Sequence, residues 1–181
     1  MRLTFASLCL AVLATPLPAA DCPPGTDHSD RIAALLSEVR AAETEAEARR
    51  LTNAMWAIWA EAPDEAAQAV LDRGMEKRAA FDLLGAIAEF DILVDYCPDY
   101  AEGYNQRAFA HFIRGDYPAA LTDLDRALAR DPNHVAAMAG RALTLMGLGR
   151  TEEGQAALRA ALALHPWLPE RRMLTEAGTD L

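Results

Sequence analysis

The sequence predicts an all-α protein built as an array of antiparallel helical hairpins. Prolines recur at positions 63, 98, 132 and 166, at steps of 35, 34 and 34 residues. Arg73, Arg107 and Arg141 recur in phase with them, 34 residues apart. A fixed period of this length is typical of repeat proteins, in which each unit buries its apolar face against its neighbours.

The middle repeat, residues 99–132, shows why each unit is expected to be a pair of helices. Apolar and small residues recur every three or four positions from Tyr104 to Phe112, and again from Ala120 to Leu128. Asp116 lies between the two runs and is suited to cap the second helix. The proline at the end of the repeat stops that helix, because the residue before a proline is pushed out of the α region.

The same layout predicts two more hairpins, over residues 64–98 and 133–166. Asp99 and Asn133 follow their prolines directly, so we expect them to cap the helices that come next.

The flanking segments extend the array. Residues 30–63 carry two further helical patterns, which we interpret as a degenerate fourth hairpin, and Thr44–Glu47 has the form of a capping box within it. Trp56 falls beside the apolar stripe of its helix, so the pattern leaves its burial open. Downstream, residues 167–181 are expected to form a capping helix, from about Leu168 to Ala177, and a tail.

The first twenty residues have the layout of a cleavable secretory signal. Arg2 is followed by an apolar run from Leu8 to Leu13 and then by small residues with prolines. The run is shorter than the ~20 residues that a membrane-spanning helix needs. Asp21 precedes Cys22, which argues against a lipid anchor on that cysteine. We therefore expect a periplasmic or secreted protein that begins with a short segment, residues 21–29.

Charge excludes one class of partner. Without Arg2, 27 acidic residues face 16 basic ones and the net charge is −11. Such a chain is repelled by phosphate backbones, so we expect no nucleic-acid partner. No later segment is apolar enough to predict a membrane span.

Two cysteines, Cys22 and Cys97, remain once the signal has removed Cys9. An even number of cysteines in an exported chain favours a disulfide, and two free thiols are the alternative. A bridge would close a ring of about 75 residues and contribute about 2–4 kcal/mol to stability. In a third interpretation, Cys97 is a reactive thiol and Cys22 its resolving partner.

The recurring positions of the three complete repeats resemble the tetratricopeptide repeat family. Its pattern places bulky, small and bulky residues on the first helix, small, bulky and small residues on the second, and then proline. The matching residues are Val70, Gly74, Lys77, Ala86, Phe90, Leu93 and Pro98; Tyr104, Ala108, His111, Ala120, Leu124, Ala127 and Pro132; and Met138, Ala142, Leu145, Gly154, Leu158, Ala161 and Pro166. Lys77 and His111 depart from the pattern, because an aromatic residue is usual there.

The resemblance covers residues 67–166 and implies a right-handed superhelical array whose first helices line a concave groove. It places seven candidate residues in that groove: Met75, Arg78, Asn105, Phe109, Phe112, Leu143 and Met146. Family members that hold a C-terminal carboxylate use lysines, arginines and asparagines, and no matching lysine is present here. An apolar groove suits an amphipathic helix or an extended hydrophobic segment. The alternative is that these apolar side chains pack between hairpins.

Two structural ion pairs are predicted inside the hairpins. Glu89 and Asp123 each follow an arginine of the repeat series by 16 residues, which pairs them with Arg73 and Arg107. The third repeat has Ala157 at this position and lacks the acid.

The sequence contains no arrangement typical of catalysis. Its four histidines are not at metal-ligand spacing from each other or from a cysteine, and no nucleophile turn or glycine-rich phosphate loop is present. We expect no metal or cofactor, and a non-enzymatic scaffold that binds a protein or peptide. The alternatives are a redox or other enzymatic factor centred on Cys97 and a homo-oligomeric structural subunit.

Overall fold

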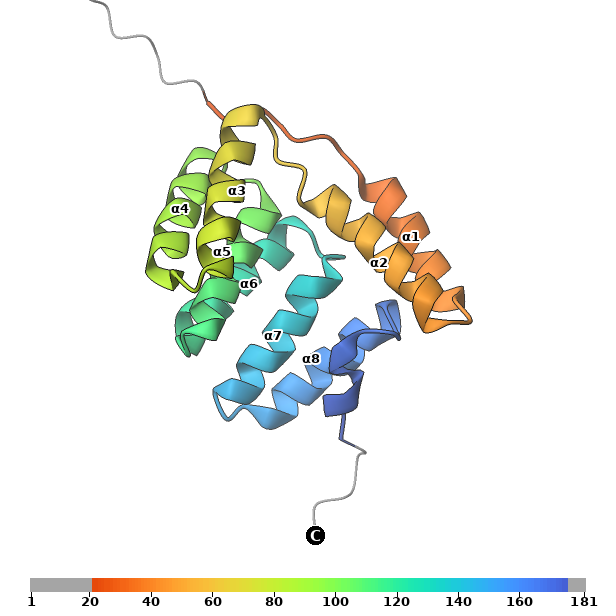
Figure 1. The fold of residues 1–181 in the computed structure, drawn as a ribbon. Helices are drawn as coiled ribbons and strands as arrows, with labels where there is room; N and C mark the ends of the chain where they lie inside the picture. The colour runs from red at the N-terminus through yellow and green to blue at the C-terminus, as the bar shows by residue number, and fades with distance from the viewer. Residues whose placement is uncertain (1–20, 176–181) are drawn as a thin grey trace, which may run out of the picture.

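The computed structural model describes residues 21–175, which contain eight α-helices and no strand (Figure 1). The signal expected over residues 1–20 lies outside the described residues. The helices are α1 (Ser29–Ala41), α2 (Glu45–Trp59), α3 (Glu65–Ala79), α4 (Leu83–Tyr96), α5 (Ala101–Ile113), α6 (Tyr117–Arg130), α7 (Val135–Gly147) and α8 (Thr151–Leu164), followed by the 3-10 helix η1 (Pro169–Met173).

Helices α3 to α8 form three antiparallel hairpins that stack in chain order, so the predicted all-α array is confirmed. Within each hairpin the two helices pack on each other, and α4 and α6 each pack on the first helix of the next hairpin. The close approach depends on small residues, since Ala86, Ala108 and Ala120 are fully buried. At Gly74 a Cβ atom would overlap the ring of Phe90.

Only some of the helix caps that the sequence predicts are present in the structure. Asp116 accepts a hydrogen bond from the amide of Ala119 at 3.3 Å, and Thr44 accepts one from the amide of Glu47 at 3.2 Å, as predicted. These two side chains satisfy amides that the first turn of each helix leaves free.

Asp99 and Asn133 do not cap helices, so those two expectations are wrong. The N-caps are the next residues, Tyr100 and His134, because the Tyr100 amide donates to the Cys97 carbonyl and the His134 amide to the Asp131 carbonyl. Each turn therefore takes up one more residue after the proline than we expected.

The N-terminal hairpin, α1 with α2, forms as predicted but does not continue the stack. It leaves α3 and packs on the other end of the array, where its buried stripe meets Val135, Leu164 and Trp167 (Figure 1). The interpretation of residues 30–63 as a fourth stacked unit is therefore wrong.

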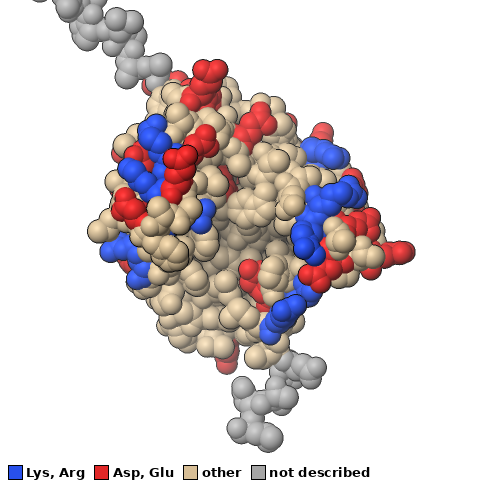
Figure 2. All heavy atoms as spheres, in the orientation of Figure 1, with Lys and Arg blue, Asp and Glu red and all other residues tan. Residues whose placement is uncertain are grey.

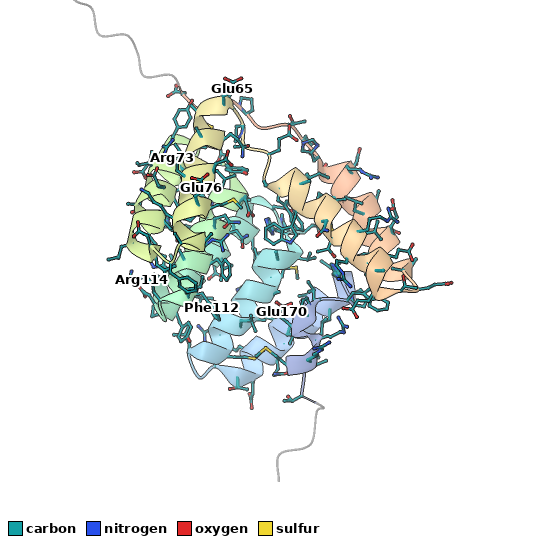
Figure 3. All side chains as sticks on the ribbon, in the orientation of Figure 1. Glu65, Arg73, Glu76, Phe112, Arg114 and Glu170 are labelled. Carbon is teal, nitrogen blue, oxygen red and sulfur yellow. A yellow bond between two sulfur atoms is a disulfide. The ribbon has the colours of Figure 1, made fainter. Side chains whose placement is uncertain are left out.

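The N-terminal hairpin docks where it does because the helix faces at the two ends of the array differ in polarity. Exposed positions of α3 carry Glu65, Arg73 and Glu76, which are hydrated and offer nothing to an apolar helix (Figure 3). The stripe of α2, including Leu51 and Met55, is buried against apolar side chains at the C-terminal end instead.

The end of the array is covered by a shorter element than expected. In place of a helix from Leu168 to Ala177, the described chain has η1, and Leu168 is buried against Ala139 and Ala161. Gln155 of α8 holds the segment by bonding the Met173 carbonyl and the Thr175 amide, each at 2.9 Å. The segment caps the last hairpin without a further α-helix.

The predicted Cys22–Cys97 disulfide is present, with the two Cα atoms 5.1 Å apart. It joins the segment before α1 to the end of α4, and the side chain of Cys97 is only 1% exposed. Among the described residues, no helix has the length and hydropathy to cross a membrane.

Candidate functional site

The concave side of the array contains an apolar cleft of 310 Å³. In Figure 2 the centre of the molecule is hollowed and mostly uncharged, with basic and acidic side chains gathered around it. The cleft is lined by Thr52 and Trp56 of α2; Asn105, Gln106, Ala108, Phe109 and Phe112 of α5; Leu124 of α6; Ala136, Ala139, Gly140, Leu143 and Thr144 of α7; and Leu168, Pro169 and Glu170 near η1. Phe112 and Glu170 mark two sides of this lining in Figure 3.

Four of the seven predicted groove residues line this cleft: Asn105, Phe109, Phe112 and Leu143. The side chain of Phe109 is 46% exposed, although it lies in the middle of a helix packed on both sides. An exposed aromatic ring in a concave surface is typical of a binding site.

The remaining three have other positions. Met75 packs in the core of the first hairpin, and Met146 lies against Gly154 of α8, so both are packing residues. Arg78 places its guanidinium 4.7 Å from the ring centre of Phe109. Burial lowers the pKa of Arg78, while Glu102 acts against that shift, and its Nε atom is buried without a hydrogen-bond partner.

Trp56 is the wall residue that the sequence did not assign. It is 36% exposed and is oriented by edge-to-face contacts with Trp59 at 5.7 Å and with His134 at 6.3 Å. Its side chain reaches the cleft because α2 crosses to the C-terminal end of the array. The helical pattern showed only that Trp56 lies beside the buried stripe, and it gave no signal for where the hairpin would dock.

A buried polar network lies beside the cleft and centres on Glu102, which is 1% exposed. Its carboxylate accepts hydrogen bonds from Asn105 at 2.9 Å, Gln106 at 2.5 Å and His134 at 2.8 Å. Because His134 Nδ1 accepts from the Ala137 amide, Nε2 carries the proton that is donated to Glu102. The network satisfies a carboxylate that would be costly to bury alone.

The same network holds the C-terminal end of α2. Trp59 stacks on His134 with ring centres 4.1 Å apart, and its indole Nε1 donates to Asp131 at 3.1 Å. The Tyr100 hydroxyl donates to the Trp59 carbonyl at 2.7 Å. These contacts anchor the C-terminal end of the helix that carries Trp56.

Both predicted ion pairs are present. Arg73 bonds Glu89 at 3.1 Å, and Arg107 bonds Asp123 twice at 2.7 Å. Lys77, at a position where the family has an aromatic residue, also bonds Glu89 at 2.6 Å, and together Lys77 and then Arg73 lower the pKa of that carboxyl. These pairs stabilise the hairpins and do not line the cleft.

A second hollow of 810 Å³ lies between the N-terminal segment and the loops that follow α2, α4 and α6. Its walls include the disulfide and several carboxylates, among them Asp27, Glu61 and Asp95. Within residues 21–175, no three His, Cys, Asp or Glu side chains are arranged to hold a metal ion.

Stacked hairpins with small residues at each crossing define a helical-repeat protein, and comparison with known families agrees. Two models of the tetratricopeptide repeat match the chain, over residues 71–135 and residues 111–175. Together they span more than half of its length, so the chain belongs to the tetratricopeptide repeat family.

Its relatives share the repeats over part of their length. A TPR repeat-containing protein of Rhizobium etli is 31% identical over 98 residues, which is 52% of this chain and 45% of that protein. The tetratricopeptide repeat protein 36 homolog of Nematostella vectensis is 40% identical over 67 residues, 37% of each chain. The chain thus spans less than half the length of these curated relatives.

Solved structures share the fold. The TPR domain of Arabidopsis OM64 superposes with a TM-score of 0.59 at 23% identity, over 61% of this chain and 91% of that one. The first TPR of Spaghetti (RPAP3), bound to the HSP90 peptide SRMEEVD, gives 0.57 at 21% identity, over 60% and 89%. Similarity at this level of identity shows the fold and no more.

Proposed function

We propose that the chain is a non-enzymatic scaffold that binds a segment of a partner protein in its concave cleft. The observation that carries the proposal is the pair of exposed aromatic side chains, Trp56 and Phe109, in the walls of one apolar cleft. The family supports it, since the first TPR of RPAP3 holds an HSP90 peptide and the TPR2B domain of yeast Sti1 is found in a complex with pHsp70.

We further propose that the protein works outside the cytoplasm, after removal of residues 1–20. The disulfide supports this location, because such bonds persist in oxidising compartments. N-terminal sequencing of protein recovered from the periplasm or the medium should begin at Asp21. Protein that retains Met1 and remains in the cytoplasm would refute the location and leave the binding proposal intact.

Crosslinking tests the binding proposal. The protein is crosslinked in the periplasmic or secreted fraction, and the captured partners are compared among the wild type, Phe109→Glu and Leu143→Glu. Ala160→Glu is the control, since it adds the same charge at an exposed position of α8 that does not line the cleft. We expect both cleft variants to lose partners that the control retains. Partners captured equally by all four proteins would exclude the cleft.

The alternative of a redox factor centred on Cys97 is less well supported. A reactive thiol needs an accessible sulfur in an electropositive environment. The side chain of Cys97 is instead almost completely buried in the core of the first hairpin. A bridge in this position is better suited to stapling the N-terminal segment to the array.

A homo-oligomeric subunit is the second candidate, and one surface favours it. Phe81, Leu84 and Ile92 are large apolar side chains exposed at α4 and the turn before it. Gel filtration of the wild type and Leu84→Glu tests this candidate. An oligomer that dissociates on this substitution would support it, and a wild-type monomer would reject it.

A further inference from the structure

We propose that two copies of the chain associate through the exposed face of α4, antiparallel and related by a two-fold axis at Ala88. The interface is the α4 stripe, which consists of Phe81, Leu84, Ala88 and Ile92. The inference rests on the homo-oligomer proposed above as the second candidate and names its interface and geometry. In the view of Figure 1, α4 lies on the opposite side of the array from α1 and α2, and none of the four residues lines the apolar cleft.

The α4 stripe distinguishes the first hairpin from the other two. Leu84, Ala88 and Ile92 follow each other at steps of four residues, so they share one face of the helix. All three are exposed, Leu84 by 67% and Ile92 by 54%. The same positions of the repeat are occupied on the other two hairpins by Pro118, Thr122 and Arg126 and by Glu152, Ala156 and Ala160. The stacking of the repeats therefore does not require large apolar residues on this face.

The backbone of the turn before α4 is strained. Phe81 has a φ of 61°, in the left-handed region that favours glycine, and the equivalent residues of the other two turns are Gly115 and Gly149, each with a φ of 76°. The side chain of Phe81 is 79% exposed, so packing within the chain does not offset this strain. A strained residue without such packing is a candidate for a functional contact. Contact with a second molecule would bury the ring.

The order of residues in the α4 stripe is self-complementary. In an antiparallel pair of helices with the axis at Ala88, residues equally far before and after position 88 face each other. Leu84 of each copy then meets Ile92 of the other, and Ala88 meets Ala88. The small side chain of Ala88 lets the two helices approach closely at the crossing. A two-fold interface needs this property, because the same patch must fit itself.

Charge favours the antiparallel arrangement. Asp95 lies in the last turn of α4, at the negative end of the helix dipole, and this turn has no basic residue. In a parallel pair, Asp95 would face Asp95 of the other copy. In the antiparallel pair it lies beside the positive, N-terminal end of the other α4, whose first turn has no acidic residue. The N-cap carboxylate there, Asp82, already accepts a hydrogen bond from the amide of Gly85 at 3.0 Å.

The area of the α4 stripe predicts a weak and reversible dimer. Burial of the exposed parts of this stripe on two copies removes on the order of 800 Å² from water, whereas stable specific interfaces bury about 1,200–2,000 Å². Each copy also carries a net charge of −10, which opposes association at low salt. We therefore expect the dimer to form only at high protein concentration.

Sedimentation of the wild type between about 10 μM and 1 mM, at about 0.15 M salt, tests the association. We expect monomer at the lowest concentration and mostly dimer at the highest. Ala88→Glu places two like charges at the axis and should weaken dimerisation by about 10-fold or more. Thr122→Glu is the matched control, since it adds the same charge at the equivalent exposed position of α6 and should leave dimerisation unchanged.

Phe81→Gly separates a role in association from a role in folding. It relieves the strained φ, so the Tm of the monomer, measured at low protein concentration, should rise by about 2–4 °C. It also removes the ring, so dimerisation should weaken by about 10-fold. A lower Tm would show that the ring packs within its own chain and would contradict the role assigned to Phe81.

Cysteine crosslinking tests the geometry. Mild oxidation should join Ala88→Cys to itself, because the axis brings the two Cβ atoms close to the about 3.5–4.5 Å that a disulfide spans. Thr122→Cys, at the equivalent position of α6, should stay monomeric. Leu84→Cys should crosslink when mixed with Ile92→Cys and not with itself, since like residues lie roughly 12 Å apart along the antiparallel pair. The native disulfide is protected, because Cys97 is only 1% exposed.

Three outcomes would overturn the inference. A wild type that remains monomeric at 1 mM, within the about 10 μM to 1 mM range of the sedimentation test, rejects the dimer. If this monomer binds neutral phosphatidylcholine vesicles and Leu84→Glu does not, the α4 stripe belongs to a lipid surface instead. An oligomer in which Ala88→Cys crosslinks no better than Thr122→Cys keeps the homo-oligomer and rejects this interface. The proposal of partner binding in the cleft stands in each case, because α4 contributes no residue to the cleft.

Discussion

Arg107 shows how one buried charge connects three helices. Its guanidinium bonds Asp123 of α6 and also Asp91 of α4, which precedes it by 16 residues. Burial by itself would lower the pKa of Arg107, but the hydrogen bonds to Asp123 and then Asp91 outweigh it and raise the pKa above its ordinary value. Arg141 uses the same backward spacing to bond Asp125 at 2.7 Å, since Ala157 offers it no forward partner.

Replacing Arg107 by Met should therefore destabilise the protein far more than Arg73→Met. Asp123 is buried and would lose its main partner, which costs about 3–5 kcal/mol. Arg73 is half-exposed, and its pair with Glu89 is backed by Lys77, so its loss should cost less than about 1 kcal/mol. Urea unfolding of both variants measures the difference.

The double variant Arg107→Met with Asp123→Leu is the control for the first change. It should recover much of the lost stability, because it removes the unpaired carboxylate. Equal destabilisation by the two single variants would show that burial does not decide the strength of these pairs.

At the scale of elements, the N-terminal hairpin is anchored on the last repeat through His165. The His165 Nδ1 accepts from the Trp167 amide at 3.2 Å, so Nε2 carries the proton and lies 2.7 Å from Thr52 Oγ1 of α2. Thr52 in turn donates to the Ala48 carbonyl, which leaves its oxygen free to accept. Burial lowers the pKa of His165 below its ordinary value of 6.5. The anchor therefore requires neutral imidazole.

The pH dependence of stability follows from this anchor. As the pH falls below about 6.5, the unfolded chain takes up a proton at His165 that the native state resists. The contribution of His165 to the free energy of unfolding is therefore complete above that pH and is lost below it. The slope that this one group adds is at most about 1.4 kcal/mol per pH unit.

The measurement compares urea unfolding of the wild type and His165→Gln from pH 8 to pH 5. Subtracting one curve of unfolding free energy against pH from the other removes the contribution of the carboxylates and of the other histidines. We expect the wild type to lose more stability toward low pH than the variant. Parallel curves would mean that His165 titrates alike in both states.

At the scale of the whole molecule, the hairpin bridges the two ends of the array. The disulfide ties the segment before α1 to α4, and the chain after α2 continues into α3. At the other end, Thr52 meets His165, and Glu45 lies 3.9 Å from Arg171 near η1. Because of this docking, α2 adds a wall to the groove that is lined by α5 and α7.

Removing the disulfide should loosen the attachment of the N-terminal hairpin, α1 with α2, to the rest of the array. The variant Cys22→Ala with Cys97→Ala should lose about 2–4 kcal/mol of unfolding free energy. Hydrogen exchange should rise more in α1 and α2 than in α5 to α8, whose mutual packing does not involve the bridge. A uniform rise over all helices would contradict the special role of the disulfide in holding the hairpin.

The sequence by itself determined the helices, the three stacked hairpins and the two ion pairs, because each depends on spacing along the chain. It favoured the disulfide through the number of cysteines and not through their spacing. The resemblance to the tetratricopeptide repeat family placed Asn105, Phe109, Phe112 and Leu143 on the concave side. Only the tertiary structure decided that the N-terminal hairpin leaves the stack, since that choice depends on which distant faces are apolar and which are charged. The position of Trp56 in the cleft wall follows from that docking, and no local pattern encodes it.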